Sequence, residues 1–137
     1  METMKRFSQA EHVLLLLLYS PGSGRSYNEP VDGKTRLMKL VFLLDKEARS
    51  DFPLRLVAYG YVEEKVIEFS SNRRLSVYRL SEKGLPVAKD YWAKLPPEAK
   101  RDTFSVKNQF NAMSMTKLLH YVYSSFPEYT GRSMIKK

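Results

Sequence analysis

The stretch VIEFSSNRRLSVYRLSEKG, from Val66 to Gly84, constrains the fold more than any other part of the chain. Its first half places β-branched Ile67 and aromatic Phe69 on one phase of an extended run, which is typical of a strand. Turn-forming residues come next, and they are Ser70, Ser71 and Asn72. A second extended run follows, with the apolar residues Leu75, Val77, Tyr78 and Leu80. The stretch therefore predicts a β-hairpin that leads into a helix.

The expected turn carries Arg73 and Arg74, which a hairpin would project into solvent. Exposed arginines at such a tip suit the phosphates of a nucleic acid or a narrow minor groove, and a hairpin of this kind is typical of the wing of a winged-helix domain. An ordinary soluble hairpin also exposes charged side chains at its turn. Both interpretations of the tip stay open.

Length and composition indicate one domain. The chain has 137 residues, of which 43% are hydrophobic, and this is enough for a core of useful size. We expect a single domain over 1–137, with helices and the wing in 8–84 and a helical extension in 85–137. The expected fold class is α+β: a mainly helical, winged-helix-like domain with one β-hairpin and C-terminal helices.

Cysteine usage and hydropathy bear on the compartment. The chain lacks cysteine, which excludes disulfides and thiolate chemistry and agrees with a reducing environment. The longest apolar run, Val13 to Tyr19, has seven residues, too few to span a bilayer, and no small-residue cleavage pattern follows it. We expect a cytoplasmic protein with no membrane partner.

The net charge of +8 is unevenly distributed. Residues 1–70 contain ten basic and ten acidic side chains, whereas residues 71–137 contain thirteen basic and five acidic ones. An excess confined to one half favours a polyanionic partner, such as DNA, RNA or an acidic protein, because the fields of neighbouring charges add up. A lysine-rich solvated surface would give the same count.

Capping signals and apolar spacing predict five helices, over about 8–19, 36–49, 81–94, 98–110 and 114–125. Ser8 and Glu11 form a capping box for the first, and Thr35 can cap the second. The fourth is expected to turn Phe104, Val106 and Phe110 inward. Between Asp51 and Tyr61 the periodicity is lost, and we expect extended or irregular backbone in which the buried or half-buried anchors are Leu54, Leu56, Val57 and Tyr59.

Three basic residues fall on one side of the second helix at about 100° per residue: Arg36, Lys39 and Lys46. Such a stripe could follow the phosphates of a nucleic acid. Asp45 and Glu47 interrupt the positive field, and a charged outer face that keeps the helix soluble is an equally good interpretation.

Nothing in the sequence points to catalysis. His12 lies beside five consecutive leucines and is expected in the core or at its boundary, and no acid or nucleophile at a recognisable spacing joins His120. Glu63 and Glu64 are adjacent on an extended segment, so their carboxylates would point to opposite faces. We expect no enzyme, no cofactor and no metal site, although a deep polar pocket around His120 would reopen the question.

Three motifs carry a resemblance to a known family: VDGKTRLMKLVFLLDKE, YRLSEKG and MTKLLHYVYSSFPEYTGRS. They resemble YwgA-like proteins, a largely uncharacterised prokaryotic family that is often archaeal, and the match runs from the first helix to the C-terminus. The family's usual form is similar to GRTKLQKLLFLLEKE, a YGP turn, LTEKG and LLRYVYEKYPEYTxKS. The resemblance implies a winged-helix core with C-terminal helices and a distant similarity to Panacea-type antitoxin domains, which neutralise toxins. It implies no catalytic residues.

The chain departs from the family at one point. Relatives place a helix between the YGP turn and the wing, whereas here only Val62 to Glu64 separate Gly60 and Tyr61 from the expected first strand. A winged-helix protein reads base edges with that helix in the major groove. We therefore expect weak sequence readout.

The leading functional hypothesis is a DNA-binding transcription regulator. In this hypothesis, phosphates of duplex DNA are contacted by Arg73, Arg74 and Arg79 of the hairpin, helped by Arg36, Lys39 and Lys46. The alternative is an antitoxin-like interaction module without DNA binding, in which the basic half docks an acidic protein or the tyrosine-rich last helix forms a hot spot. A homodimer through the apolar first helix or the YVY segment also stays open.

Overall fold

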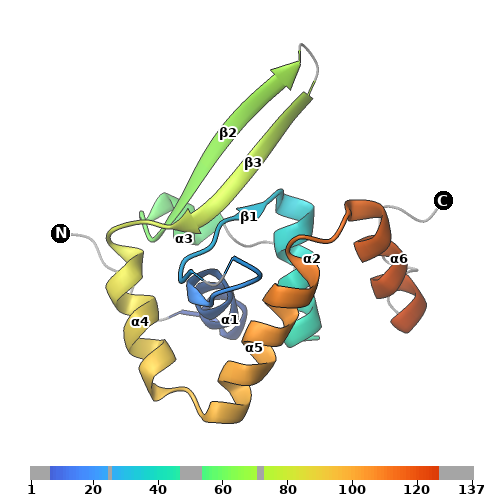
Figure 1. Ribbon diagram of the computed structural model, residues 1–137. Helices are drawn as coiled ribbons and strands as arrows, with labels where there is room; N and C mark the ends of the chain where they lie inside the picture. Colours follow the sequence, from blue (N-terminus) through green and yellow to red (C-terminus); the bar gives the residue numbers. More distant parts are fainter. Residues whose placement is uncertain (1–6, 25, 47–53, 71–72, 127–137) are drawn as a thin grey trace.

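The computed structural model describes residues 7–24, 26–46, 54–70 and 73–126. Within these ranges the fold is α+β, with six helices and three antiparallel strands (Figure 1). In chain order the elements are α1 (Gln9–Tyr19), β1 (Val31–Asp32), α2 (Lys34–Leu44), α3 (Leu54–Ala58), β2 (Val62–Ser70), β3 (Arg73–Leu80), α4 (Gly84–Lys94), α5 (Pro97–Phe110) and α6 (Met115–Ser125).

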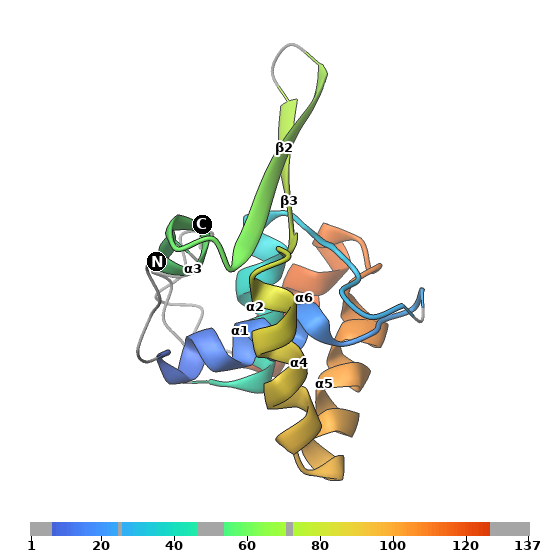
Figure 2. The same ribbon diagram turned by 90° about the vertical axis from the view of Figure 1, so that its left-hand side faces the viewer.

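The β2–β3 hairpin extends away from the helices in both ribbon views (Figures 1 and 2). Its register runs from Val62 opposite Leu80 to Ser70 opposite Arg73, with an irregularity between Glu68 and Ser70. The predicted hairpin is confirmed, but its first strand begins at Val62, earlier than expected. Short β1 pairs with β3, so the strand order is β1-β3-β2 and β2 forms an outer edge.

Helix α1 is the centre of the core. Four of its five leucines, those at 14, 15, 17 and 18, have no exposed surface, and α2, α4 and α5 pack around it. The predicted capping box is present, because the Ser8 hydroxyl accepts from the Glu11 amide and the Ser8 amide donates to the Glu11 carboxylate. Burial of each leucine stabilises the fold by about 1.5–3 kcal/mol. These leucines are core residues and offer no dimer surface. In the described part of the chain, no helix has the length and hydropathy needed to cross a bilayer.

Helix α2 differs from its prediction at both ends. It begins at Lys34 after Gly33, which has φ +98° and gives no side-chain cap, so Thr35 does not cap it. It ends at Leu44, and the backbone of Asp45 is extended. The expectation that the helix continues through residues 45 and 46 is therefore wrong. Residues 47–49 lie outside the described ranges. Leu37, Leu40 and Val41 are buried at i, i+3 and i+4, so one face of α2 packs into the core.

The segment before the hairpin contains a helix that the sequence did not predict. Extended or irregular backbone was expected there, yet α3 covers Leu54–Ala58. Buried Leu56 anchors this single turn, and the Tyr61 amide donates to the Leu56 carbonyl. Gly60, at φ +84°, then redirects the chain into β2. Tyr59, expected as an anchor, is 37% exposed.

Helices α4, α5 and α6 lie close to their predicted ranges. Ser114 caps α6 by accepting from the Lys117 amide, as expected. In α5 the prediction is confirmed for Phe110, which is buried, and for Val106, which packs against the core, but it is wrong for Phe104, which is exposed. The buried residues of this helix are Thr103, Lys107 and Phe110. Those three share one helical face at i, i+4 and i+7, from which Phe104 is rotated away.

Lys107 lies completely buried beneath the end of α1. Its ammonium nitrogen donates to the carbonyls of Leu18 (2.9 Å) and Ser20 (2.8 Å), which satisfies acceptors that a helix C-terminus leaves without intrahelical partners. Loss of hydration lowers the pKa of Lys107 to about 7, although the nearby Glu29 carboxylate opposes the shift. This lysine therefore adds nothing to the basic surface.

Candidate nucleic-acid interface

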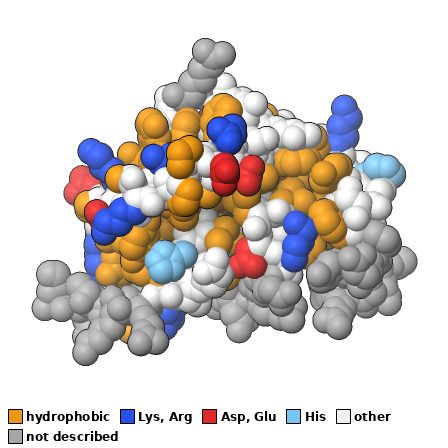
Figure 3. All heavy atoms as spheres, turned by 90° about the horizontal axis from the view of Figure 1, so that it is seen from below, with side chains coloured by type: hydrophobic (Ala, Val, Ile, Leu, Met, Phe, Trp, Pro, Cys, Tyr) orange, Lys and Arg blue, Asp and Glu red, His pale blue; other side chains and the backbone are white. Residues whose placement is uncertain are grey.

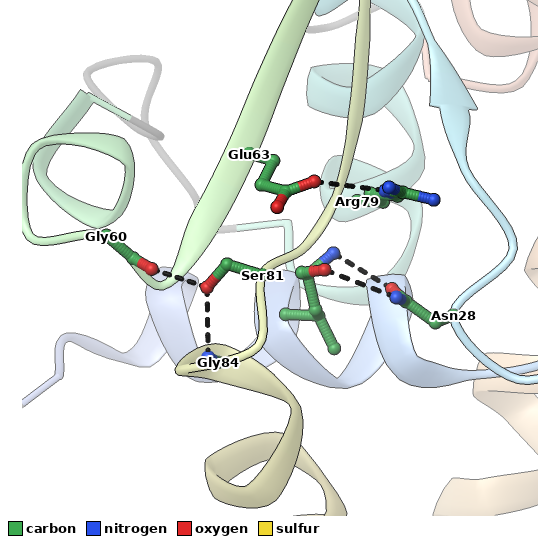
Figure 4. Close-up of polar contacts among 7 residues, drawn as sticks. Asn28, Gly60, Glu63, Arg79, Ser81 and Gly84 are labelled. Atoms are coloured by element: carbon green, nitrogen blue, oxygen red, sulfur yellow. Dashed lines mark hydrogen bonds and ion pairs between the residues drawn. The ribbon is translucent and has the colours of Figure 1, made fainter.

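Two sets of contacts at the end of β3 fix the root of the hairpin to the body (Figure 4). The Ser81 hydroxyl donates to the Gly60 carbonyl and accepts from the Gly84 amide, which joins the end of β3 to the α3–β2 connection and to α4. On the other side, the Asn28 carboxamide pairs with both backbone groups of Leu80, at 2.8 and 3.2 Å. The exposed arginines further along the hairpin are thus carried on a rigid base.

Two of the three hairpin arginines have a carboxylate opposite them. Arg74 lies 3.3 Å from Glu68, and Arg79 lies 3.0 Å from Glu63. The register dictates both pairs, since cross-strand partners share a face of the ribbon. All four side chains are at least 48% exposed, and exposed pairs of this kind typically contribute less than about 1 kcal/mol. A phosphate can therefore replace either carboxylate at small cost.

Arg73 stands at the distal end of β3, opposite Ser70. It is exposed and has no ion pair with any residue in the described ranges. Among the residues that the sequence proposed for phosphate contact, Arg73 is the one most open to an anion.

The basic stripe of α2 is not grouped with the hairpin arginines. Arg36 donates to the Phe110 carbonyl at the end of α5 and to the Asp32 carbonyl, and burial lowers the pKa of Arg36. Lys39 lies 5.2 Å from the centre of the Tyr123 ring. These contacts attach α5 and α6 to α2.

Lys46 continues the same pattern at the end of the stripe. Its nitrogen lies 4.6 Å from the centre of the Phe126 ring and donates to the Leu43 carbonyl. Cation–π contacts of this kind hold helices together by about 0.5–2 kcal/mol each. The side chains of Arg36, Lys39 and Lys46 are thus used inside the molecule.

Sequence reasoning missed the acidic partners of the hairpin. Glu63 and Glu68 lie on β2 opposite Arg79 and Arg74, and a hairpin register drawn from the turn would have paired them. β2 also holds Glu64, whose carboxylate accepts from the Tyr78 hydroxyl at 2.9 Å. Burial of the ring and this bond raise the pKa of Tyr78 to about 12.

The hairpin also exposes apolar side chains. Val66 is 52% exposed and Ile67 is 40% exposed. Because adjacent residues of a strand point to opposite faces, each face of the ribbon presents one of them. The hairpin is therefore amphipathic rather than uniformly charged.

A cleft of about 440 Å³ lies between α1, α4 and α5. It is lined mainly by apolar side chains, with His12 and Tyr91 in ring contact at 4.5 Å. Figure 3 shows the face around the α4–α5 turn, where hydrophobic side chains gather between scattered charged ones. His120, around which a pocket was considered, is exposed on α6 and does not line the cleft. The absence of an enzymatic activity stays a prediction.

Within the described ranges, no three histidine, aspartate or glutamate side chains gather to hold a metal ion. The tyrosines of α6, considered as a hot spot, are used mainly in packing. The ring centres of Tyr121 and Phe110 lie 4.9 Å apart, and Tyr121 is 40% exposed. Tyr123 lies under the ammonium group of Lys39.

No protein-family model, curated protein or solved structure matches this chain. The resemblance to YwgA-like proteins stays a prediction from the motifs. The first motif falls on β1 and α2, and the last begins on α6 and continues into 127–137, outside the described residues. What bears on function is the hairpin and the distribution of its charges.

Proposed function

We propose that this chain is a winged-helix-like DNA-binding protein whose β2–β3 hairpin contacts the phosphates of a duplex. The observation that carries the proposal is the order of the elements: α2 and α3 are followed by a protruding two-stranded hairpin, and β1 pairs beside β3. A helix pair followed by such a hairpin is the layout of a winged helix, and this supports the assignment by analogy of fold.

The hairpin arginines support the choice of partner. Arg73 and Arg74 stand near the distal end and Arg79 near the root, all exposed. Guanidinium groups bind phosphate oxygens with two parallel hydrogen bonds, so each can exchange a weak surface ion pair for a phosphate contact.

Helix α3 argues for little base readout. It has five residues, so at a rise of about 1.5 Å per residue it is about 7.5 Å long. Binding would then rest on phosphate contacts and on the shape of the groove, which position a protein without reading base edges. A regulatory role would have to come from shape preference or from a partner.

The test is a fluorescence-anisotropy titration of a random labelled duplex at several salt concentrations. Three phosphate contacts predict a slope of log affinity against log salt of roughly −3, and Arg73→Ala/Arg74→Ala should reduce it to roughly −1. Lys89→Ala/Lys94→Ala on α4 removes the same charge from exposed positions and should leave the slope unchanged. No duplex binding by the wild type at low salt would refute the proposal.

A second candidate is an antitoxin-like protein-interaction module. The exposed Val66 and Ile67, together with carboxylates that neutralise two hairpin arginines, favour a protein surface over a polyanion. If this candidate is right, a defined protein partner should co-purify with the chain even after nuclease treatment. Ile67→Glu should abolish that co-purification, and the wild type should not bind duplex DNA.

A further inference from the structure

The two strands of the hairpin carry opposite charge. β3 contains three arginines and no acidic residue, whereas β2 contains one lysine among three glutamates. β2 is the outer strand of the sheet, and β3 lies between β2 and β1. The hairpin therefore has an acidic long side and a basic long side.

The acidic side is the one that adjoins α3. Helix α3 contacts β2, and both ribbon views place it beside the root of that strand (Figures 1 and 2). The charged residue of α3 is Arg55, which donates two hydrogen bonds to the buried Glu11 carboxylate. A duplex lying against α3 and β2 would meet three glutamates, one lysine and an arginine that is already paired with Glu11.

The basic side adjoins β1 and the start of α2. The Gly33 amide donates to the Ser76 carbonyl at 2.6 Å, so α2 begins beside β3. Lys34, the first residue of α2, is exposed there, and the acidic residue nearest in sequence is Asp32. Figure 4 shows the Arg79 guanidinium on the β1 side of β3, with Glu63 reaching across from β2.

The spacing along β3 suits a nucleic-acid backbone. From Arg73 to Arg79 there are six residue steps, about 20 Å at about 3.4 Å per residue in an antiparallel strand. One strand of B-DNA presents a phosphate about every 3.4 Å along its axis, so about six phosphates face this length.

We infer that the duplex lies against β3 and the start of α2, on the opposite side of the hairpin from α3. The inference rests on the DNA binding proposed above and gives that site an orientation. If α3 instead entered a groove of the duplex, the protein would bind with the α3 and β2 side of the hairpin. In the orientation inferred here the contacts are to phosphates, and affinities for unrelated duplex sequences should agree within a few-fold.

Single-charge variants on the two sides test the orientation. In this orientation Lys34 adds a fourth phosphate contact to those of the three arginines, so the wild-type salt slope should steepen to roughly −4. Lys34→Ala and Arg79→Ala should each weaken duplex binding by roughly 3- to 10-fold and reduce that slope by about one. Lys65→Ala, which removes the same charge from exposed β2, should leave both within twofold. Thermal melts of all three variants check that the fold is retained.

Site-specific crosslinking gives a readout that does not depend on charge. The chain has no cysteine, so Thr35→Cys on α2 and Ala58→Cys on α3, both at exposed positions, can each carry one benzophenone maleimide. Illumination with a labelled random duplex should crosslink position 35 and not position 58. Two results would overturn the orientation while leaving the proposed function intact. One is duplex binding with crosslinking from position 58, and the other is duplex binding that is weakened by Lys65→Ala but by neither Lys34→Ala nor Arg79→Ala. Absence of duplex binding by the wild type would overturn both.

Discussion

Arg55 donates to both carboxylate oxygens of Glu11, from Nε at 2.9 Å and from Nη2 at 2.7 Å. The fork joins α3 to the first turn of α1, where Glu11 also closes the capping box with Ser8. The Glu11 side chain is only 8% exposed, so its charge depends on these donors. Helix α3 is consequently held against the core.

Arg55→Ala should destabilise the protein, because it leaves a buried carboxylate with one fewer partner. Arg55→Lys should recover only part of the loss, since an ammonium group cannot form the two-pronged contact. Urea denaturation of both variants measures the effect. Lys65→Ala, an exposed change, should lie close to the wild type, and equal stability of all the proteins would contradict the role given to the fork.

Lys107 should make stability depend on pH. Its pKa is about 7 in the folded protein and about 10.5 in the unfolded chain, so between these values the unfolded chain holds more protons. Stability should therefore rise as pH increases from 7 to 9.5, by at most about 1.4 kcal/mol per pH unit. Lys107→Met should abolish the rise, whereas Lys89→Met on the exposed face of α4 should keep it. Denaturation midpoints measured from pH 7 to 9.5 test this prediction. If stability still rises with pH in Lys107→Met, this lysine is not the source of the rise.

Glu68→Gln should strengthen duplex binding. The change removes the carboxylate that competes with phosphate for Arg74, together with a charge that repels the duplex. At low salt we expect a gain in affinity of roughly two- to fivefold. Glu98→Gln, on the first turn of α5, changes the net charge equally and serves as the matched control. If both variants gain equally in anisotropy titrations, net charge alone explains the effect.

Gly84→Ala should disturb the root of the hairpin. A β-carbon at this position would lie 2.0 Å from the Tyr61 carbonyl oxygen, which belongs to the backbone and cannot swing aside. Overpacking of this kind costs about 1–3 kcal/mol or more. A lower melting temperature should accompany loss of protection from hydrogen exchange at the Ser81 amide, which donates to that carbonyl. Unchanged exchange at Ser81 would count against the expected contact.

Local signals were sufficient for much of the fold. The Ser8–Glu11 capping box, the Ser114 cap and the alternation in the hairpin each involve neighbours in sequence, and each was predicted in place. Helix α3 was missed because one turn is shorter than the window in which periodicity is visible. Burial of Leu56, a tertiary effect, stabilises it.

The candidate site was harder to predict, because its electrostatics depend on distant partners. Arg36 looked available on a helix wheel, but its acceptor, the Phe110 carbonyl, lies 74 residues away. Lys107 counted toward the basic half, yet it is buried under the end of α1. The three hairpin arginines keep the exposure that the sequence implied, but of these only Arg73 has no ion pair within the described ranges.

The contact between Asn28 and Leu80 also leaves no unpaired backbone group of Leu80 on the β1 side of β3. An uncovered strand offers a row of unpaired amides and carbonyls to any other chain, which is a common start of aggregation. At the root of β3 the Asn28 side-chain amide pairs with the backbone N–H and C=O of Leu80. β1 pairs with the next part of the strand, at Tyr78 and Val77. One carboxamide thus extends by one residue the part of the β3 edge that β1 covers, and it adds no strand that could itself be extended.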